Sequence, residues 1–171
     1  KSAKGKHPSS AKWLKEANAA YAWAQKNTPA KHEAHAVHPR IVAAASLYRC
    51  TGEKKYLDQF RKDITSHNSF NIAEEGWFTA NYWELAAGIY ALLPKNHPNL
   101  DLELQKKVKN QVLAAADKEY VATAAKRGYR MGFDWIKMNS CGTFSTPMVT
   151  SPAVAYKFTG DRKYLDVMHT T

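Results

Sequence analysis

The chain has 171 residues and a hydrophobic fraction of 44%, which is enough for one domain with a buried core. An aromatic content of 12% excludes a disordered polypeptide, and no apolar run approaches the ~18–20 residues that span a bilayer. The net charge of +10 is interleaved with apolar helix positions and accompanies no nucleic-acid-binding motif, so we expect neither nucleic acid nor membrane as a partner. The basic N-terminus lacks the apolar segment of a signal peptide, which leaves secreted, periplasmic and cytoplasmic locations open.

The first part of the chain has helical periodicity. Residues 9–27 open with Ser9 or Ser10 as the N-cap and place apolar residues on one stripe, at Trp13, Ala17, Tyr21 and Ala24. A second helix is predicted to begin at Pro39, because proline suits the first helical position, and to bury Ile41, Ala45 and Tyr48. A third helix follows at once, over residues 53–64.

The second part continues the same pattern. Residues 81–93 form an apolar helix that Pro94 ends, and its inward positions are Trp83, Ala86, Ala87, Tyr90 and Leu93. A long amphipathic helix covers residues 100–120, another covers about 143–158, and a last one starts after Gly160. Because no segment alternates with period two over a useful length, the predicted fold class is all-α.

One phrase occurs twice. "YRCTGEKKYLD" spans residues 48–58 and "YKFTGDRKYLD" spans 156–166, with the two threonines 108 residues apart. In each, the glycine suits the left-handed residue after a helix, and Asp161 (Glu53 in the first copy, a weaker cap) suits the N-cap of the next helix. The phrase therefore predicts two tight helix–glycine–helix corners. The spacing fits two helical hairpins per repeat, as in a solenoid or a closed toroid.

The order of these elements resembles the family 9 glycoside hydrolases, the cellulase-type inverting glycosidases. The similarity rests on "AAASLYRCTGEKKYLDQF", "NYWELAAGIYALLP", "VKNQVLAAADKEYVA" and "FDWIKMNSCGTFSTPMVTSPAVAYKFTGDRKYLD", and it extends from Ser10 to Met168. The resemblance implies an (α/α)₆ barrel, of which residues 1–171 would be a single segment of about half.

The resemblance also implies an activity. Family members cleave β-linked gluco- or glucosamine-oligosaccharides by direct attack of water, with a carboxylic acid and a carboxylate on opposite faces of the sugar. Their Asp-x-x-Asp motif and acidic Glu do not occur in the matched segment, so we expect the catalytic carboxylates to lie outside this chain. The remaining barrel segments would then belong to a second chain or to the rest of a fragmented protein.

Two residues are candidates for the sugar cleft. The family has Trp-Gly-Ser-Asn in a loop, and Trp135 occupies the tryptophan position. Ile136, Lys137 and Met138 replace the next residues, and Asn139 comes one place late. A tryptophan ring stacks on a pyranose and an asparagine hydrogen-bonds a hydroxyl. A structural role for Trp135 at the barrel rim is the alternative, and Asp134 beside it has no partner carboxylate.

Three histidines stand near one another, His32, His35 and His38. The i, i+3 spacing differs from that of the His-Glu-x-x-His zinc motif, and the third histidine is rotated away from the first two. The prolines on both sides of this segment indicate an irregular, solvated loop. We therefore predict no metal site and no cofactor.

Other polar residues are also more simply explained by structure. Glu74 and Glu75 are adjacent and do not face each other, so a charge pair in a first helical turn is favoured over an acid–base pair. Trp77 could reach the cleft or staple the helix start. Cys50 and Cys141 lack metal-ligand spacing, and two buried thiols are expected.

Two other functions stay open. A non-catalytic helical-repeat domain could bind a protein or a glycan through its concave face. Another enzyme with a helical toroid, such as a polysaccharide lyase, is the third possibility.

Overall fold

The computed structural model describes residues 9–28, 33–65, 77–126 and 149–170, and every element in these ranges is a helix. The elements in chain order are α1 (Ser10–Asn27), α2 (Glu33–Thr51), α3 (Lys54–Thr65), α4 (Trp77–Ala91), α5 (Leu102–Ala115), η3 (Ala116–Val121), α6 (Ala122–Lys126), α8 (Thr150–Thr159) and α9 (Arg162–Thr170). The predicted all-α class is confirmed.

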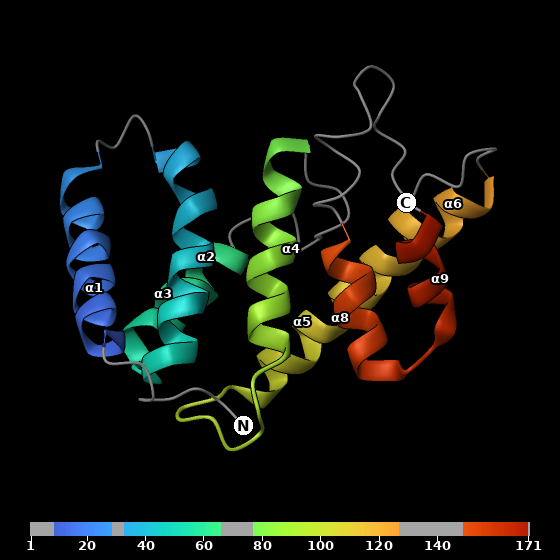
Figure 1. The fold of residues 1–171 in the computed structure, drawn as a ribbon. Coiled ribbons are helices and arrows are strands. Elements are labelled where there is room, and N and C mark those ends of the chain that lie inside the picture. Colours follow the sequence, from blue (N-terminus) through green and yellow to red (C-terminus); the bar gives the residue numbers. More distant parts are fainter. Residues whose placement is uncertain (1–8, 29–32, 66–76, 127–148, 171) are drawn as a thin grey trace.

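Three helices form a row through the middle of the molecule. Helix α4 packs against α2 on one side and against α8 on the other. All three run in the same direction and begin at the same end of the molecule, which is the upper end in Figure 1. Helices α3, α5 and α9 return in the opposite sense, so successive helices pair as hairpins.

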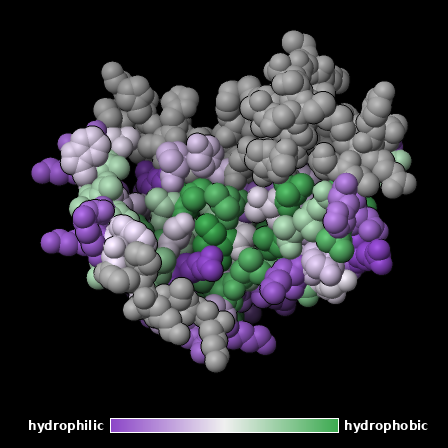
Figure 2. All heavy atoms as spheres, in the orientation of Figure 1, coloured by the Kyte–Doolittle hydropathy of each residue, from purple (hydrophilic) through white to green (hydrophobic). Residues whose placement is uncertain are grey.

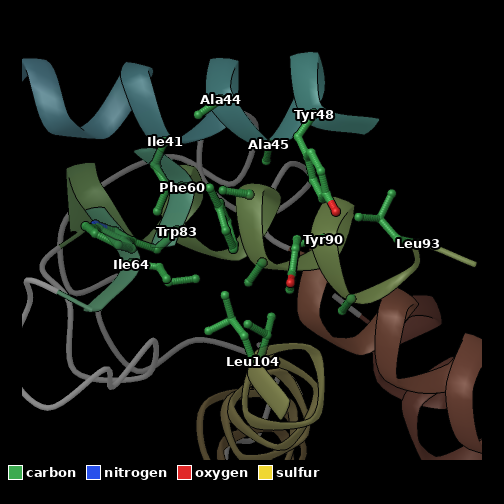
Figure 3. Close-up of a cluster of buried hydrophobic side chains, with 14 of the residues drawn as sticks. Ile41, Ala44, Ala45, Tyr48, Phe60, Ile64, Trp83, Tyr90, Leu93 and Leu104 are labelled. Atoms are coloured by element: carbon green, nitrogen blue, oxygen red, sulfur yellow. The ribbon is translucent and has the colours of Figure 1, made fainter. Parts of the chain in front are cut away.

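The main core lies between α2, α3, α4 and α5 (Figure 3). The ring of Phe60 stacks on Tyr90 with 4.6 Å between centroids, and Tyr48 lies 6.1 Å from Tyr90 on its other side. All three side chains are inaccessible to solvent. Burial of one such ring stabilises the fold by about 1.5–3 kcal/mol. The stack therefore fixes α2 and α4 to α3. The predicted inward positions of α2 and α4 are buried as expected.

Helix α1 is attached much more loosely. None of its residues is buried, and the Trp13 side chain is 55% exposed. The ring of Tyr21 meets Tyr56 of α3 edge-on at 5.3 Å, and Asn18 accepts a hydrogen bond from the Tyr56 hydroxyl. The predicted stripe therefore exists on α1, but only its Tyr21 position is covered.

The two predicted corners are confirmed, and they are built alike. Gly52 and Gly160 have φ angles of 71° and 69°, in the left-handed region that glycine adopts without steric cost. Each glycine N–H donates to the carbonyl of the tyrosine four residues earlier, Tyr48 or Tyr156, at 2.8 Å. Asp161 accepts from the backbone of the residue two places on at 3.0 Å, as an N-cap should.

Two predictions in the first half are wrong. Residues 33–38 are helical rather than an irregular loop, so Pro39 lies inside α2 instead of beginning it. Proline removes one helical hydrogen bond, and the burial of the following turns of α2 outweighs that loss. Cys50 is exposed rather than buried, because it lies near the C-terminal end of α2 and lines an open groove between α1, α2 and the end of α4.

The predicted long helix over residues 100–120 contains an irregularity. Asp101 caps α5 by accepting from the Leu104 N–H at 2.9 Å, and the helix then widens into the π-helix η3. A π-turn rotates the residues that follow it relative to an α-helix, and such turns are frequent at functional sites. Here it places Tyr120 in the interior.

Candidate functional site

A buried carboxyl group joins three helices of the second half. The Glu84 side chain, on α4, is 3% exposed. Both of its oxygens accept from the Tyr120 hydroxyl at 3.0 Å, and one also accepts from the backbone N–H of Ser151 at 3.3 Å. The three residues come from α4, η3 and the first turn of α8. We call them the Glu84 cluster.

Local sequence explains how each residue reaches the cluster. Glu84 stands in "NYWELAAGIY", where nearly every side of the helix is apolar and covered. The π-turn of η3 directs Tyr120 towards α4, and the first turn of α8 offers an N–H that has no partner within its own helix. Because Ser151 lies in that first turn, the cluster lies towards the end where α2, α4 and α8 begin.

Burial dominates the electrostatics of the cluster. It raises the pKa of Glu84 to about 7, against the hydrogen bonds from Ser151 and Tyr120, which favour the carboxylate. The nearby charge of Glu119 raises the pKa further. Burial also raises the pKa of Tyr120, and the Glu84 charge adds to that effect, so the tyrosine stays a proton donor. The pKa of the Glu84 carboxyl group therefore lies near neutral pH.

A carboxyl group that titrates near 7 has the acidity that a general acid needs. The described residues nevertheless enclose Glu84 from solvent, so its visible role is to tie α4, η3 and α8 together. Sequence reasoning missed this residue. The available signal was a single glutamate in an otherwise apolar helix, because glutamate is almost never fully buried without a partner.

A second buried polar group lies in the first half. Asp63 of α3 receives two hydrogen bonds from the Arg40 guanidinium, at 2.9 and 2.7 Å, and a third from Gln59 at 3.0 Å. This ion pair neutralises a buried charge and fixes α2 to α3, which is a structural role. It was not predicted from the sequence.

Most of the predicted site residues lie outside the described ranges. This holds for Trp135 and Asn139, and for Asp134, Glu74, Glu75, His32 and Cys141. Trp77 begins α4, and His35 and His38 lie in α2, where only the backbone is described. The assignment of Trp135 and Asn139 to a sugar cleft therefore stays a prediction.

Comparisons with known proteins leave the family open. No model of a protein family matches this sequence, and a search of the curated proteins finds no match. Within the described ranges, no helix is both long and apolar enough to cross a membrane. The same ranges bring together no group of three His, Cys, Asp or Glu side chains that could hold a metal ion.

Proposed function

We propose that this chain is part of a glycoside hydrolase that cleaves β-linked gluco- or glucosamine-oligosaccharides by inversion. In this role it supplies scaffold and part of the sugar cleft, and the catalytic carboxylates belong to other segments of an (α/α)₆ barrel. Trp135 stacks on a sugar ring and Asn139 binds a hydroxyl. Glu84 is not assigned as the acid, because its carboxyl group is enclosed.

One observation supports this proposal above the others. Helices α2, α4 and α8 lie side by side, run in the same direction and begin at one end of the molecule (Figure 1). Each of them packs against the helix that follows it in the opposite sense, α3, α5 or α9, as in the hairpins of a helical toroid. Parallel inner helices bring the segments that precede them to one end, and binding residues concentrate on such connecting segments. Trp135 and Asn139 belong to the segment that precedes α8.

The proposal is tested by titration calorimetry of the whole chain with cellohexaose and, separately, with the β-1,4-linked hexasaccharide of glucosamine. We expect one of the two sugars to bind, and we expect Trp135→Ala to weaken that binding about tenfold or more, because an aromatic platform is lost. Trp23→Ala is the matched control, because Trp23 is an exposed tryptophan on α1 and should leave the affinity unchanged.

Two outcomes contradict the proposal. The first is the absence of heat with either hexasaccharide from a chain whose helical circular dichroism is intact. The second is an equal loss of affinity in the Trp23→Ala and Trp135→Ala variants, since the contact with sugar would then not be specific to Trp135.

A non-catalytic helical domain that binds a protein or a glycan is the second candidate. A groove of about 1510 Å³ between α1, α2 and the C-terminal part of α4 favours it, because the groove is larger than the ~300–1,000 Å³ typical of small-molecule sites. If neither hexasaccharide binds and a helical peptide does, this candidate replaces the first.

A further inference from the structure

Helix α4 is covered on every side but one. Its exposed apolar positions are Tyr82 and Leu85, Ile89 is half-buried, and the exposed Leu92 follows directly after its last residue. These four positions follow i, i+3, i+7, i+10 and so form a single stripe on the helix. Leu85 and Leu92 are 44% and 45% exposed, although the rest of α4 lies in the core. A helix this apolar is normally buried all round.

The stripe continues across α2 into the groove. Ala43, Ser46 and Cys50 line the groove from α2, and Ile89 and Leu92 line it from α4. The far wall is α1, which contributes Trp13 and a series of alanines. Figure 2, seen from the same side as Figure 1, shows hydrophobic residues gathered at the centre of this face, over α4 and the helices beside it.

The surface also extends to α8. Val154 of α8 packs at Gly88 of α4, and Ala155 packs with Tyr164 of α9 on another side. The side of α8 turned away from both carries Ala153 and Tyr156, which are exposed. We call the exposed sides of the three row helices the open face. It is made of Ala43, Ser46 and Cys50, of Tyr82, Leu85, Ile89 and Leu92, and of Ala153 and Tyr156.

The charge at the open face has one sign. Among the described residues no aspartate or glutamate lines the groove, and the charge of Arg40 there is neutralised by Asp63. Arg49 lines the groove without a carboxylate partner, and Lys157 projects from the exposed side of α8, also without one, among the described residues. Unpaired cations at the edge of an apolar surface select a partner that brings carboxylates.

We infer that the open face is a docking surface for amphipathic α-helices, whose apolar side covers α2, α4 and α8 and whose carboxylates meet Arg49 and Lys157. Rows of parallel helices present ridges and grooves into which other helices pack, and an apolar groove of this kind takes a helix by its i, i+3, i+4, i+7 positions. A second copy of this chain fits less well, because it carries the same cations and a net charge of +10. The inference goes beyond sugar binding and does not depend on it.

The test uses the whole chain and two stapled 22-residue helical peptides as probes. Both peptides carry leucines at i, i+3, i+4 and i+7, and their flanking positions are glutamate in one peptide and lysine in the other. By fluorescence anisotropy we expect the glutamate peptide to bind about tenfold or more tightly than the lysine peptide. Arg49→Glu should reduce that preference.

A matched pair of leucine variants locates the surface. Leu85→Asp should weaken binding of the glutamate peptide about tenfold or more, because a charge is placed on the apolar stripe. Leu102→Asp is the control, since Leu102 is an exposed leucine at the start of α5, outside the open face. Both side chains are on the surface, so neither variant should unfold the chain, and circular dichroism checks this.

Three results overturn the inference. One is the absence of binding by the glutamate peptide, and another is equal binding of the two peptides. The third is a dimer of the chain in sedimentation that Leu85→Asp dissociates, because the open face would then belong to a second copy. Each leaves the sugar titration unaffected, so failure of the docking surface and failure of the proposed function are distinguishable.

Discussion

The two helix–glycine–helix corners have nearly the same sequence and, apart from the cap at Asp161, the same internal hydrogen bonds, but different surroundings. At the first corner the segment between α4 and α5 folds over Gly52. The Tyr48 hydroxyl donates to the Pro98 carbonyl at 2.7 Å, and the Asn99 amide donates to the Gly52 carbonyl at 3.0 Å. At the second corner no described residue lies within 4 Å of the position that a side chain would take at Gly160.

The tyrosines of the two corners differ in burial in the same way. Tyr48 is fully buried, with its ring against His97 at a centroid distance of 4.6 Å, and Tyr156 is 38% exposed. The comparison separates two kinds of information in the repeated phrase. The phrase itself dictates the corner, because the glycine, the cap and the threonine hydroxyl, which accepts from the backbone N–H two residues on, all act locally. Burial of the tyrosine depends on a partner from elsewhere in the chain.

Replacing the tyrosine of each corner by alanine should give the largest difference in stability between the two corners. Tyr48→Ala should lower the free energy of unfolding by about 3–5 kcal/mol, because a large buried ring leaves a cavity. Tyr156→Ala, at the equivalent position of the second corner, should lower it by less than about 1 kcal/mol. Urea unfolding followed by circular dichroism measures both, and equal losses would contradict the difference in cover.

Alanine at the two glycines separates backbone strain from crowding. Either substitution places a side chain at positive φ, at about 1–2 kcal/mol. At Gly52 the new Cβ would also lie 2.8 Å from the Pro98 ring, and such overpacking adds about 1–3 kcal/mol. Gly52→Ala should therefore destabilise the chain more than Gly160→Ala in the same urea assay. The reverse order would mean that Pro98 does not cover the first corner.

The Glu84 cluster, which joins three helices of the second half, should make stability depend on pH. The pKa of Glu84 rises from the ordinary 4.5 to about 7 in the folded chain, so between these values only the folded chain holds the proton. The free energy of unfolding should then fall as the pH rises from about 4.5 to about 7, by roughly 3 kcal/mol in total, and level off above pH 7.

Glu84→Gln isolates this contribution. It keeps the shape and an acceptor for Tyr120, so its stability should lose the decline between about pH 4.5 and 7. Glu16→Gln, at an exposed glutamate of α1, should keep that decline. Identical pH profiles for wild type and Glu84→Gln would show that the carboxyl group is not held protonated.

The smallest expected difference concerns the caps of the two corners. Asp161→Ala should cost about 1 kcal/mol, because its carboxylate accepts from the Lys163 N–H. The Glu53 carboxylate instead meets the Lys55 ammonium at 2.7 Å on an exposed surface, so Glu53→Ala should change stability by less than about 0.5 kcal/mol. Thermal unfolding of both variants in parallel tests this ranking.

Local signals predicted the fold well. The helical period, the glycine of each corner and the cap at Asp161 depend on neighbours in sequence, so they could be deduced without a structure. The prediction that a helix begins at Pro39 was wrong for the opposite reason. Tertiary packing stabilises α2 although Pro39 is locally unfavourable inside a helix.

The candidate site was less predictable. The Glu84 cluster depends on contacts between residues far apart in the chain, and on a π-turn that shifts Tyr120 by a fraction of a helical turn. Periodicity cannot locate such contacts. Whether Trp135 and Asn139 form a sugar cleft is likewise a question of tertiary placement, and it remains a prediction.

The most direct test of the account is a map of backbone amide chemical shifts during titration of the chain with the hexasaccharide that binds. Sugar bound where α2, α4 and α8 begin should shift the amides in the first turns of these three helices and in the segment of Trp135. The amides of the two glycine corners, at the opposite end of the row, should stay unchanged. Shifts confined to the corners, or to the groove beside α1, would contradict the account.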